Sequence, residues 1–347
     1  MIAGGGAAPG LGPRRIRELR GAKQPPDPWR PISALTEEER VPGAAPAAVA
    51  PAFTLLLAGA ECPFTCVFCD LWRHTLDGPT PEGALAAQVR RGLAGLERTE
   101  REALAGGVLK LYNASNFFDP RAVPPADLPE IADLAGPFSR VVVECHPRLV
   151  LGAGAELWRR FADLLDGRLE VAMGLETVHP EAFEGLGKGM KLEDFARAAA
   201  ALRAEGVDVR AFVLVGAPRV PAEEAVEWAV RSTAHALEAG ACHVALIPLR
   251  SGNGALEELA RLGKVAYPVL GDLETALEGA LDLPAAWAGA VVTADLWDLE
   301  RFAACPACLP ARRERLRQAN LTGRLAPAAP CASCGFTGGS QHGRPEP

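Results

Sequence analysis

Three cysteines lie within eight residues of one another, close to residue 65, and their spacing is C-x3-C-x2-C. Thiolates from Cys62, Cys66 and Cys69 on one short loop can hold three irons of a cubane iron–sulfur cluster, which leaves the fourth iron open to a small chelating molecule. Two other interpretations are a structural zinc site completed by Cys145 or His146 and a set of unrelated buried thiols. Such tight clustering favours the iron–sulfur interpretation.

Four further cysteines form two C-x2-C pairs with 22 residues between them: Cys305, Cys308, Cys331 and Cys334. Paired knuckles of this kind are typical of one tetrahedral zinc ion in a closed, structural site. An auxiliary iron–sulfur cluster is the alternative, since four cysteines can also hold one. We favour zinc, because a bound ion would fold a short segment that has no apolar core of its own.

Six short apolar runs alternate with amphipathic helical patterns after residue 50. The runs are largely without period-2 alternation, which indicates strands buried on both faces. They are Phe53–Gly59, Val108–Ala114, Val141–Cys145, Leu169–Leu175, Val207–Val215 and Cys242–Leu249. The helical patterns between them include Glu82–Glu97, Pro129–Leu134, Glu156–Leu165, Glu193–Glu205 and Glu223–Glu238.

Alternating strands and helices predict a parallel sheet with helices outside it. Six units are too few for a closed eight-stranded barrel and suit a partial (β/α)6 TIM-like barrel, with an open doubly wound sheet as the alternative. In both architectures, chemistry belongs at the C-terminal ends of the strands. The first cysteine group directly follows the first predicted strand and therefore lies at that end.

The chain divides into four predicted regions. Residues 1–50 are rich in Gly, Ala and Pro and are expected to form a loosely ordered arm. Residues 51–285 form the barrel, and residues 286–337 form a small Cys-rich extension with one more apolar run, Ala290–Leu296. Residues 338–347 are expected to be a disordered tail.

The composition is that of a globular enzyme: 49% of residues are hydrophobic, 23% are charged, and the formal net charge is −7. An acidic chain lacks the footprint of a tight, non-specific nucleic-acid binder. A local basic face or a solvated helix face could be formed by Arg312, Arg313, Arg315 and Arg317. Neither a secretory signal nor an apolar run long enough for a membrane helix is evident, so we expect a cytoplasmic protein without membrane contact.

The first cysteine group, with the aromatic Phe68 before its last cysteine and a strand before its first, resembles the radical-SAM superfamily over roughly residues 50–300. Segments after the next three strands extend the resemblance. They are residues 110–120, 144–147, 174–177 and 186–190. These segments look like those of the radical-SAM subunit of archaeosine synthase and, more distantly, of the radical-SAM domain of the elongator catalytic subunit, both of which act on tRNA.

This resemblance implies a [4Fe-4S] cluster, S-adenosylmethionine bound at its open iron, and a low-potential electron donor such as flavodoxin or ferredoxin. The residues expected at the cofactor are Phe68, Asn113, Ser115, Asn116, Glu176 and Arg210. Phe68 would pack near the adenine. For Glu176, a structural ion pair, for example with Arg210, is the alternative. The family often has Gly-Gly-Glu after the second strand where this chain has residues 113–116, although backbone carbonyls can still serve there.

Glu144 and His146, at the end of the third strand, are the candidate catalytic residues. Glu-Cys-His-Pro stands there in place of the Glu-Ser-Arg-Pro of the archaeosine-type relatives, so His146 replaces an arginine. His179 could also take part in proton transfer, and Asn253 lies in a polar turn after the sixth strand, although both residue types are more often structural in such places.

The resulting hypothesis is an enzyme that cleaves S-adenosylmethionine reductively and abstracts a hydrogen from its substrate. A tRNA base is one substrate class, with tRNA or a partner enzyme as the expected partner, and a small metabolite or peptide is another. A hypothesis of a different class is a non-enzymatic binding protein in which both cysteine groups hold zinc.

Overall fold

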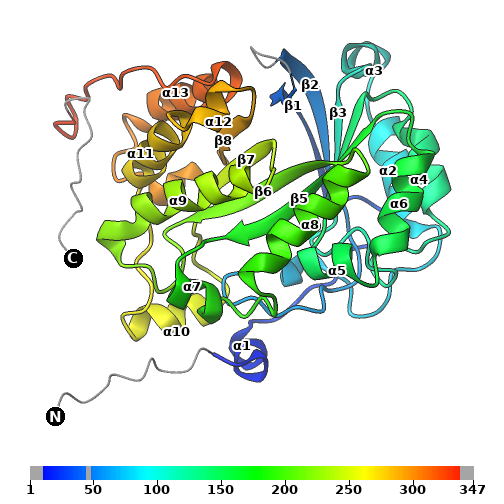
Figure 1. Cartoon of the computed structure of the whole chain (residues 1–347), viewed down its shortest axis with the longest axis horizontal. Coiled ribbons are helices and arrows are strands. Elements are labelled where there is room, and N and C mark those ends of the chain that lie inside the picture. The colour runs from blue at the N-terminus through cyan, green and yellow to red at the C-terminus, as the bar shows by residue number, and fades with distance from the viewer. Residues whose placement is uncertain (1–10, 44–47, 337–347) are drawn as a thin grey trace.

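The computed structural model describes residues 11–43 and 48–336 (Figure 1). The expected disordered tail therefore lies outside the described residues. Eight strands form one sheet: β1 (Ser33–Val41), β2 (Ala48–Leu56), β3 (Val108–Tyr112), β4 (Arg140–Glu144), β5 (Arg168–Glu176), β6 (Asp208–Val215), β7 (His243–Pro248) and β8 (Val291–Ala294).

The strands follow one another around the sheet in sequence order, from β1 to β8. All neighbours from β2 to β8 are parallel, and only β1 is antiparallel to its neighbour β2. A doubly wound sheet would reverse its strand order at a switch point, and this sheet does not. The prediction of a partial TIM-like barrel is therefore confirmed, and the six predicted runs correspond to β2–β7.

The helices cover the outer face of the sheet in Figure 1. The α-helices are α1 (Pro13–Leu19), α2 (Ala84–Ala94), α3 (Arg98–Leu104), α4 (Leu128–Ala135), α5 (Pro147–Leu151), α6 (Ala155–Leu164), α7 (Pro180–Gly185), α8 (Leu192–Ala204), α9 (Ala225–Glu238), α10 (Ala255–Arg261), α11 (Leu270–Leu281), α12 (Pro284–Trp287) and α13 (Leu309–Thr322). Three 3-10 turns are η1 (Leu71–His74), η2 (Ala222–Glu224) and η3 (Leu299–Phe302). Within the described residues, no helix has both the length and the apolar character needed to cross a membrane.

The hydrophobic core lies between the sheet and this helical layer. Along each strand, every second residue points outward and is buried there, as Leu109 and Leu111 of β3 are. Trp158 and Phe161 of α6 and Phe195 of α8 are fully buried against the same face of the sheet. The alternation with period 2 means that the other set of strand residues must fill the interior of the barrel.

Two segments outside the predicted barrel are part of its sheet. Residues 33–41 were expected in a loosely ordered arm, yet they form β1, which pairs along its whole length with β2. The run after residue 290 was placed in the C-terminal extension, yet it supplies β8, which pairs with β7. The barrel therefore begins before residue 51 and continues beyond residue 285, and its parallel strands number seven.

Helix α13 lies against both edge strands, β1 and β8. Asn320 of α13 donates to the carbonyl of Ala294 and accepts from its amide, each at 2.8 Å, so that it caps the open edge of β8. The four arginines considered as a basic face are all on this helix, and each is paired: Arg312 and Arg315 with Glu274, Arg313 with Glu300, and Arg317 with Glu38 and Glu314. The four arginines of α13 therefore take part in structural ion pairs.

Charged side chains fill the middle of the barrel interior. The Arg210 guanidinium donates to Glu170 at 2.6 Å and to Glu39 at 2.7 Å, and Arg140 donates to the other oxygen of Glu170 at 2.7 Å. Lys110 also pairs with Glu39. All these side chains are at least nine-tenths buried. Glu39 belongs to β1, which explains physically why that segment is ordered: it brings the carboxylate that two buried cations require.

Arg210 was predicted at the cofactor, but these carboxylates occupy both edges of its guanidinium. In the register of β5 and β6, Arg210 lies opposite Ala172, whereas Glu176 lies opposite Val213. Three residues of strand separate the two levels, or roughly 10 Å along the barrel. The nearest partners of Arg210 are therefore in the barrel interior and not at the strand ends.

Replacing Arg210 by Met should lower the free energy of unfolding by about 3–5 kcal/mol, because two buried carboxylates, Glu39 and Glu170, each lose one of their cationic partners. Denaturant unfolding measures this loss. The matched control is Arg168→Met on the neighbouring strand, where the side chain is 60% exposed and its partner Asp208 keeps Arg140, so the cost should be about 0–1 kcal/mol. An Arg210→Met protein of unchanged stability that no longer binds S-adenosylmethionine would instead favour the cofactor role.

Candidate active site

The loop with the first three cysteines connects β2 to η1 at the C-terminal end of the barrel. Two contacts from distant elements hold it. The amide of Val67 donates to the carbonyl of Leu186 at 2.8 Å, and the Asn253 side-chain amide donates to the carbonyl of Val67 at 2.7 Å. Asn253 also accepts from the amide of Leu256 and so caps α10. The polar turn after the sixth predicted strand therefore fastens the cysteine loop to a helix.

The three thiols of this loop are in an environment poor in water. Burial raises the pKa of Cys66 to about 12 and raises the pKa of Cys62 and Cys69 as well. Thiols must lose their protons to bind a metal, so cluster binding here would release protons and be driven by the iron charge. Asn116 donates to the Cys62 sulfur at 3.1 Å and thereby orients one ligand.

The spread of these sulfurs distinguishes a cluster from a single ion. Four sulfurs around one zinc ion, with bonds of about 2.3 Å, lie roughly 3.8 Å apart. Among the described residues, only the C-terminal cysteine group brings three or more His, Cys, Asp or Glu ligand atoms within 4.8 Å of one another. Cys62, Cys66 and Cys69 form no such group, alone or with Cys145 or His146. A cubane cluster needs no such close approach of the sulfurs, because each thiolate binds its own iron.

The chain also offers unused polar groups near this loop. Both polar atoms of the Asn113 side chain and the hydroxyl of Ser115 are buried and have no hydrogen-bond partner among the described residues. Such orphaned groups cost free energy unless a ligand or water satisfies them. Both residues follow β3, in the segment predicted to meet the cofactor. The donor chemistry of this site therefore fits a polar ligand placed next to an iron–sulfur cluster.

A buried ion pair lies opposite the cysteine loop. Lys188 donates to Glu176 at 2.7 Å, and only 6% of each side chain is exposed. Burial opposes the charge of Lys188, but Glu176 and the thiols of Cys66 and Cys62 outweigh it and raise the pKa of the lysine. The ammonium also lies 5.8 Å from the ring centre of Phe68. The Lys188 ammonium thus lies next to Phe68, Glu176 and the cysteine loop.

The backbone at Glu176 is held in an unusual conformation to make this pair. Glu176 has a φ of +68°, and the pairing register between β5 and β6 shifts between Gly174 and Glu176. A Cβ atom at Gly174 would come within 1.9 Å of the Glu176 carboxylate and 2.5 Å of the Lys188 ammonium, so a side chain there would displace the ion pair. Non-glycine residues at positive φ are uncommon and concentrate at functional sites.

Sequence reasoning did not select Lys188 as a functional residue, although it noticed the segment around it. The available signal was the Gly187-Lys188-Gly189 triplet, in which both glycines have positive φ, at +70° and +64°. This turn aims the lysine inward instead of toward solvent. A lysine flanked by glycines after a strand is common on surfaces, so the type of residue alone could not reveal its burial.

The two candidate catalytic residues differ in their freedom to react. Glu144 ends β4 on the inward-facing side, and burial raises its pKa to about 8, so it is mostly protonated at neutral pH. His146 is engaged on both ring nitrogens: the backbone amide of Arg148 donates to Nδ1, and Nε2 lies 3.1 Å from the Lys188 carbonyl oxygen. Burial lowers the pKa of His146 to about 3, and its ring stacks on Phe64 at 3.7 Å. His146 therefore positions the cysteine loop, while Glu144 retains a proton to donate.

His179 lies in a structural position. Its Nδ1 accepts from the amide of Ala182 at the start of α7, and its ring contacts Trp228 edge-on. It is separate from the residues that surround the cysteine loop. The structure thus brings together the loop, Phe68, Asn116 and Glu176 of the predicted set, and it adds Lys188.

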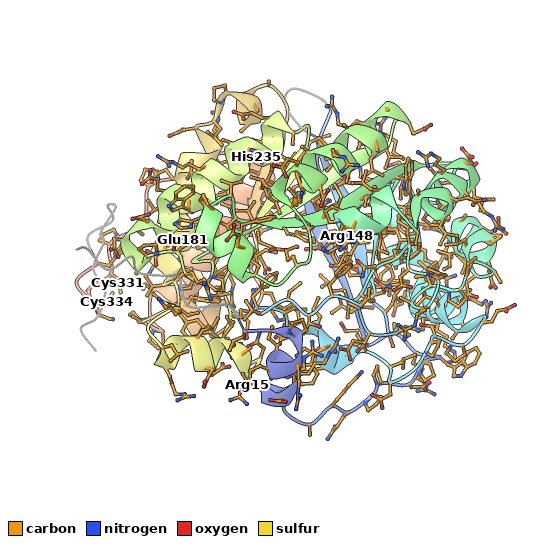
Figure 2. The ribbon with its side chains drawn as sticks, turned by 60° about the horizontal axis from the view of Figure 1, so that its bottom comes forward. Arg15, Arg148, Glu181, His235, Cys331 and Cys334 are labelled. Atoms are coloured by element: carbon orange, nitrogen blue, oxygen red, sulfur yellow. The ribbon has the colours of Figure 1, made fainter. Side chains whose placement is uncertain are left out.

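The four C-terminal cysteines come together near the start of α13. Their sulfurs all lie within 4.8 Å of one another, and those of Cys305 and Cys331 are 4.0 Å apart. Figure 2 shows Cys331 and Cys334 at the edge of the molecule, far from the barrel axis. Backbone amides of Cys334 and Ser333 lower the pKa of Cys331 to about 7, as expected for a metal-binding knuckle. This group can hold one tetrahedral metal ion.

No family model and no curated protein matches the sequence. Among solved structures, the archaeal Methanocaldococcus infernus Elp3 with an N-terminal deletion is similar, with 13% identity and a TM-score of 0.46 over 61% of this chain and 52% of that one. Methylornithine synthase (PylB) is similar with 15% identity and a TM-score of 0.43, over 74% of this chain and 80% of that one. The similarity to Elp3 thus spans about half of that structure. At these identities the likeness concerns the fold alone, and the barrel assignment rests on the strand order described above.

The C-terminal group should bind one metal ion per chain. Replacing Cys305 and Cys331 by Ser removes two of its four ligands, so elemental analysis should find one ion fewer, with any metal held by the first cysteine loop unchanged. Cys242→Ser is the matched control, because this cysteine lies between α9 and β7 and outside both groups. Equal metal content in all three proteins would contradict the assignment.

Proposed function

We propose that this protein is a radical-SAM enzyme that holds a [4Fe-4S] cluster on Cys62, Cys66 and Cys69. The observation that carries the proposal is the arrangement around the loop: three half-buried thiols that form no single-ion group with their neighbours, beside orphaned polar groups of Asn113 and Ser115. The barrel supports it, because the loop lies at the C-terminal strand ends, where such folds hold their reactive groups. The proposal thus uses features that the non-enzymatic, zinc-only hypothesis leaves without a role.

When bound, the cluster supplies one electron to the sulfonium of S-adenosylmethionine, so that its bond to C5′ breaks into methionine and a 5′-deoxyadenosyl radical, which takes a hydrogen atom from a substrate C–H. The residues of this chain bind and orient the participants. Asn116 fixes the Cys62 sulfur, and the Asn113 and Ser115 side chains offer donors and acceptors for the polar end of the cofactor.

Glu176 and Lys188 would control the charge next to the cofactor. In the structure they neutralise each other at 2.7 Å, beside Phe68. A cationic ligand that approaches Glu176 would share its carboxylate with Lys188, and Phe68 offers an apolar face for an adenine ring. Both side chains are almost fully buried, which excludes water from the place where a radical must be protected.

Glu144 is proposed as a proton donor or hydrogen-bond donor to the substrate. Its carboxyl faces the barrel interior at a strand end and is mostly protonated at neutral pH. His146 is proposed as a positioning residue, because both of its ring nitrogens are already engaged. The C-terminal group is proposed to hold structural zinc, since sulfurs 4.0 Å apart suit a single tetrahedral ion.

Replacing Cys66 by Ala should abolish both the cluster and the cleavage of S-adenosylmethionine, since one iron loses its ligand. Anaerobically reconstituted wild-type protein should contain about four irons in this loop and form 5′-deoxyadenosine when reduced. Cys242→Ala, which removes a cysteine outside both groups, should keep both properties. A colourless wild-type protein that binds only zinc would overturn the proposal, as would 5′-deoxyadenosine formation by Cys66→Ala.

For the substrate, we propose a base in tRNA, in keeping with the tRNA-modifying relatives that the segments after β3, β4 and β5 resemble. Bulk tRNA added to the reduced protein should then stimulate 5′-deoxyadenosine formation severalfold over the level without substrate. Ribonuclease-treated tRNA is the control and should lose the stimulation. If tRNA has no effect while cleavage continues, a small metabolite or peptide becomes the substrate class to test.

A further inference from the structure

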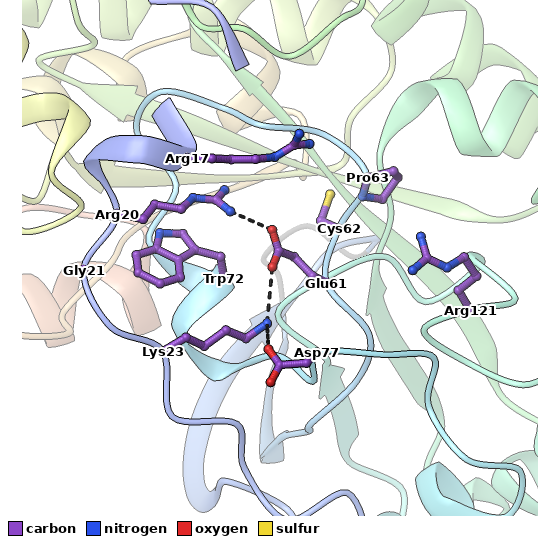
Figure 3. Close-up of a pocket in the computed structure, with 10 residues that line it drawn as sticks. All are labelled: Arg17, Arg20, Gly21, Lys23, Glu61, Cys62, Pro63, Trp72, Asp77 and Arg121. Atoms are coloured by element: carbon purple, nitrogen blue, oxygen red, sulfur yellow. Dashed lines mark hydrogen bonds and ion pairs between the residues drawn. The ribbon is translucent and has the colours of Figure 1, made fainter. Parts of the chain in front are cut away.

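A cationic pocket opens directly beside the first cysteine of the loop. Its volume is about 620 Å³, and Figure 3 shows its walls. The walls come from α1 and the segment after it, from the cysteine loop with η1 and the residues that follow, and from the segment after β3. The lining residues are Arg17, Arg20, Gly21, Lys23, Glu61, Cys62, Pro63, Trp72, Asp77 and Arg121.

The charge of this lining is opposite to that of the chain. Four cationic and two anionic side chains line the pocket, an excess of two positive charges on a protein whose formal net charge is −7. Glu61 accepts from Arg20 at 2.6 Å and from Lys23 at 3.2 Å, and Lys23 also pairs with Asp77 at 3.3 Å. These four residues therefore neutralise one another within the wall.

The excess charge belongs to Arg17 and Arg121. Arg17 donates to the hydroxyl of Thr65, which is neutral, and the Arg121 guanidinium has no acceptor in the described part of the chain. Both arginines are exposed, and in Figure 3 they lie on either side of Cys62 and Pro63. Two guanidinium groups without carboxylate partners, on two sides of one pocket, form a binding surface for an anion.

The position of Arg17 is fixed by packing. Ile16, the neighbouring residue in α1, is 2% exposed and packs with Val67 of the cysteine loop and Leu259 of α10. The backbone of Leu19 packs so closely on Gly254 that a Cβ there would lie 2.0 Å from the Leu19 carbonyl oxygen. Helix α1 is thus docked on the active-site end of the barrel and presents its arginines at the pocket.

We infer that Arg17 and Arg121 bind a phosphate group of the substrate and thereby hold the substrate next to the cluster. This inference rests on the proposed function and adds to it the chemical group that is recognised. An open pocket with two unpaired guanidiniums matches a phosphate, which accepts several charge-assisted hydrogen bonds at once. The phosphate can be a monoester of a mononucleotide or a diester of a nucleic acid, and binding experiments distinguish these two sources.

The rival explanation is that the two arginines only balance the negative charge of the cysteine thiolates. In that case their removal would change cluster assembly and leave phosphate binding intact. Lys188 already provides a buried cation close to Cys66 and Cys62, which leaves less need for a second pair at the surface. The two explanations predict different measurements on the same variants.

The test uses reconstituted holoprotein and calorimetric titration with adenosine monophosphate, adenosine and bulk tRNA. The double variant Arg17→Gln/Arg121→Gln should bind the phosphate ligand at least about tenfold more weakly than wild type, the effect of losing one or two charged hydrogen bonds. The matched control is Arg14→Gln/Arg15→Gln, which removes the same charge from exposed positions of α1 that do not line the pocket. Binding of adenosine monophosphate identifies a monoester site, and binding of tRNA alone identifies a diester site.

Three outcomes would overturn the inference: no phosphate ligand binds to wild type, adenosine binds as well as its monophosphate, or both double variants lose affinity equally. Lower iron content in Arg17→Gln/Arg121→Gln with unchanged phosphate affinity would also overturn it and support charge balance. Formation of 5′-deoxyadenosine without substrate is measured in parallel. If wild-type protein cleaves S-adenosylmethionine but binds no phosphate, only this inference fails; if it does not cleave, the proposed function fails.

Discussion

The buried charges inside the barrel constrain the rest of the structure. Arg210 and Lys110 lie on parallel strands with their charged ends away from water, and such cations are tolerated only beside carboxylates. Glu170 supplies one carboxylate from β5, but Glu39 comes from β1, which is 171 residues from Arg210 in the sequence. The antiparallel strand β1 therefore forms an edge of the partial barrel and also supplies a carboxylate to its buried cations.

This interior polar layer also separates two tasks along the barrel axis. The middle of the barrel holds charges that are paired with one another. The C-terminal end, three residues further along the strands, holds groups whose partners are incomplete: Asn113 and Ser115 have none among the described residues, and Glu144 is kept protonated by burial. Stability and reactivity are thus assigned to different levels of one set of strands, as in barrels generally.

At the reactive end, the charges are arranged around the cysteine loop at two depths. Lys188 is buried with Glu176 and lies close enough to the thiols to favour their anionic form, while Arg17 and Arg121 lie at the surface on the side of Cys62. Lys188 would stabilise the negative charge of a cluster with three thiolates from inside the protein. Arg17 and Arg121, at the surface, then remain for another anion. Glu176 has a positive φ, and the absence of a side chain at Gly174 leaves the space that the Glu176–Lys188 ion pair occupies.

Local spacing in the sequence determined the strands β2–β7, the helices α2, α4, α6, α8 and α9 and both cysteine groups, because each depends on residues that are neighbours in the chain. It could not determine that residues 33–41 join the sheet, since the reason is Glu39 and its partners on β3 and β6. The family resemblance implied that Arg210 contacts the cofactor, and only the strand register shows that Arg210 lies three residues deeper in the barrel than the level of Glu176. Lys188 and the pair of Arg17 and Arg121 likewise gained their roles from segments that meet only in the folded barrel. The sequence by itself determined which chemistry the chain can carry, and the tertiary structure decided which charges are already neutralised and which remain to bind a substrate, because neutralisation depends on distance in space.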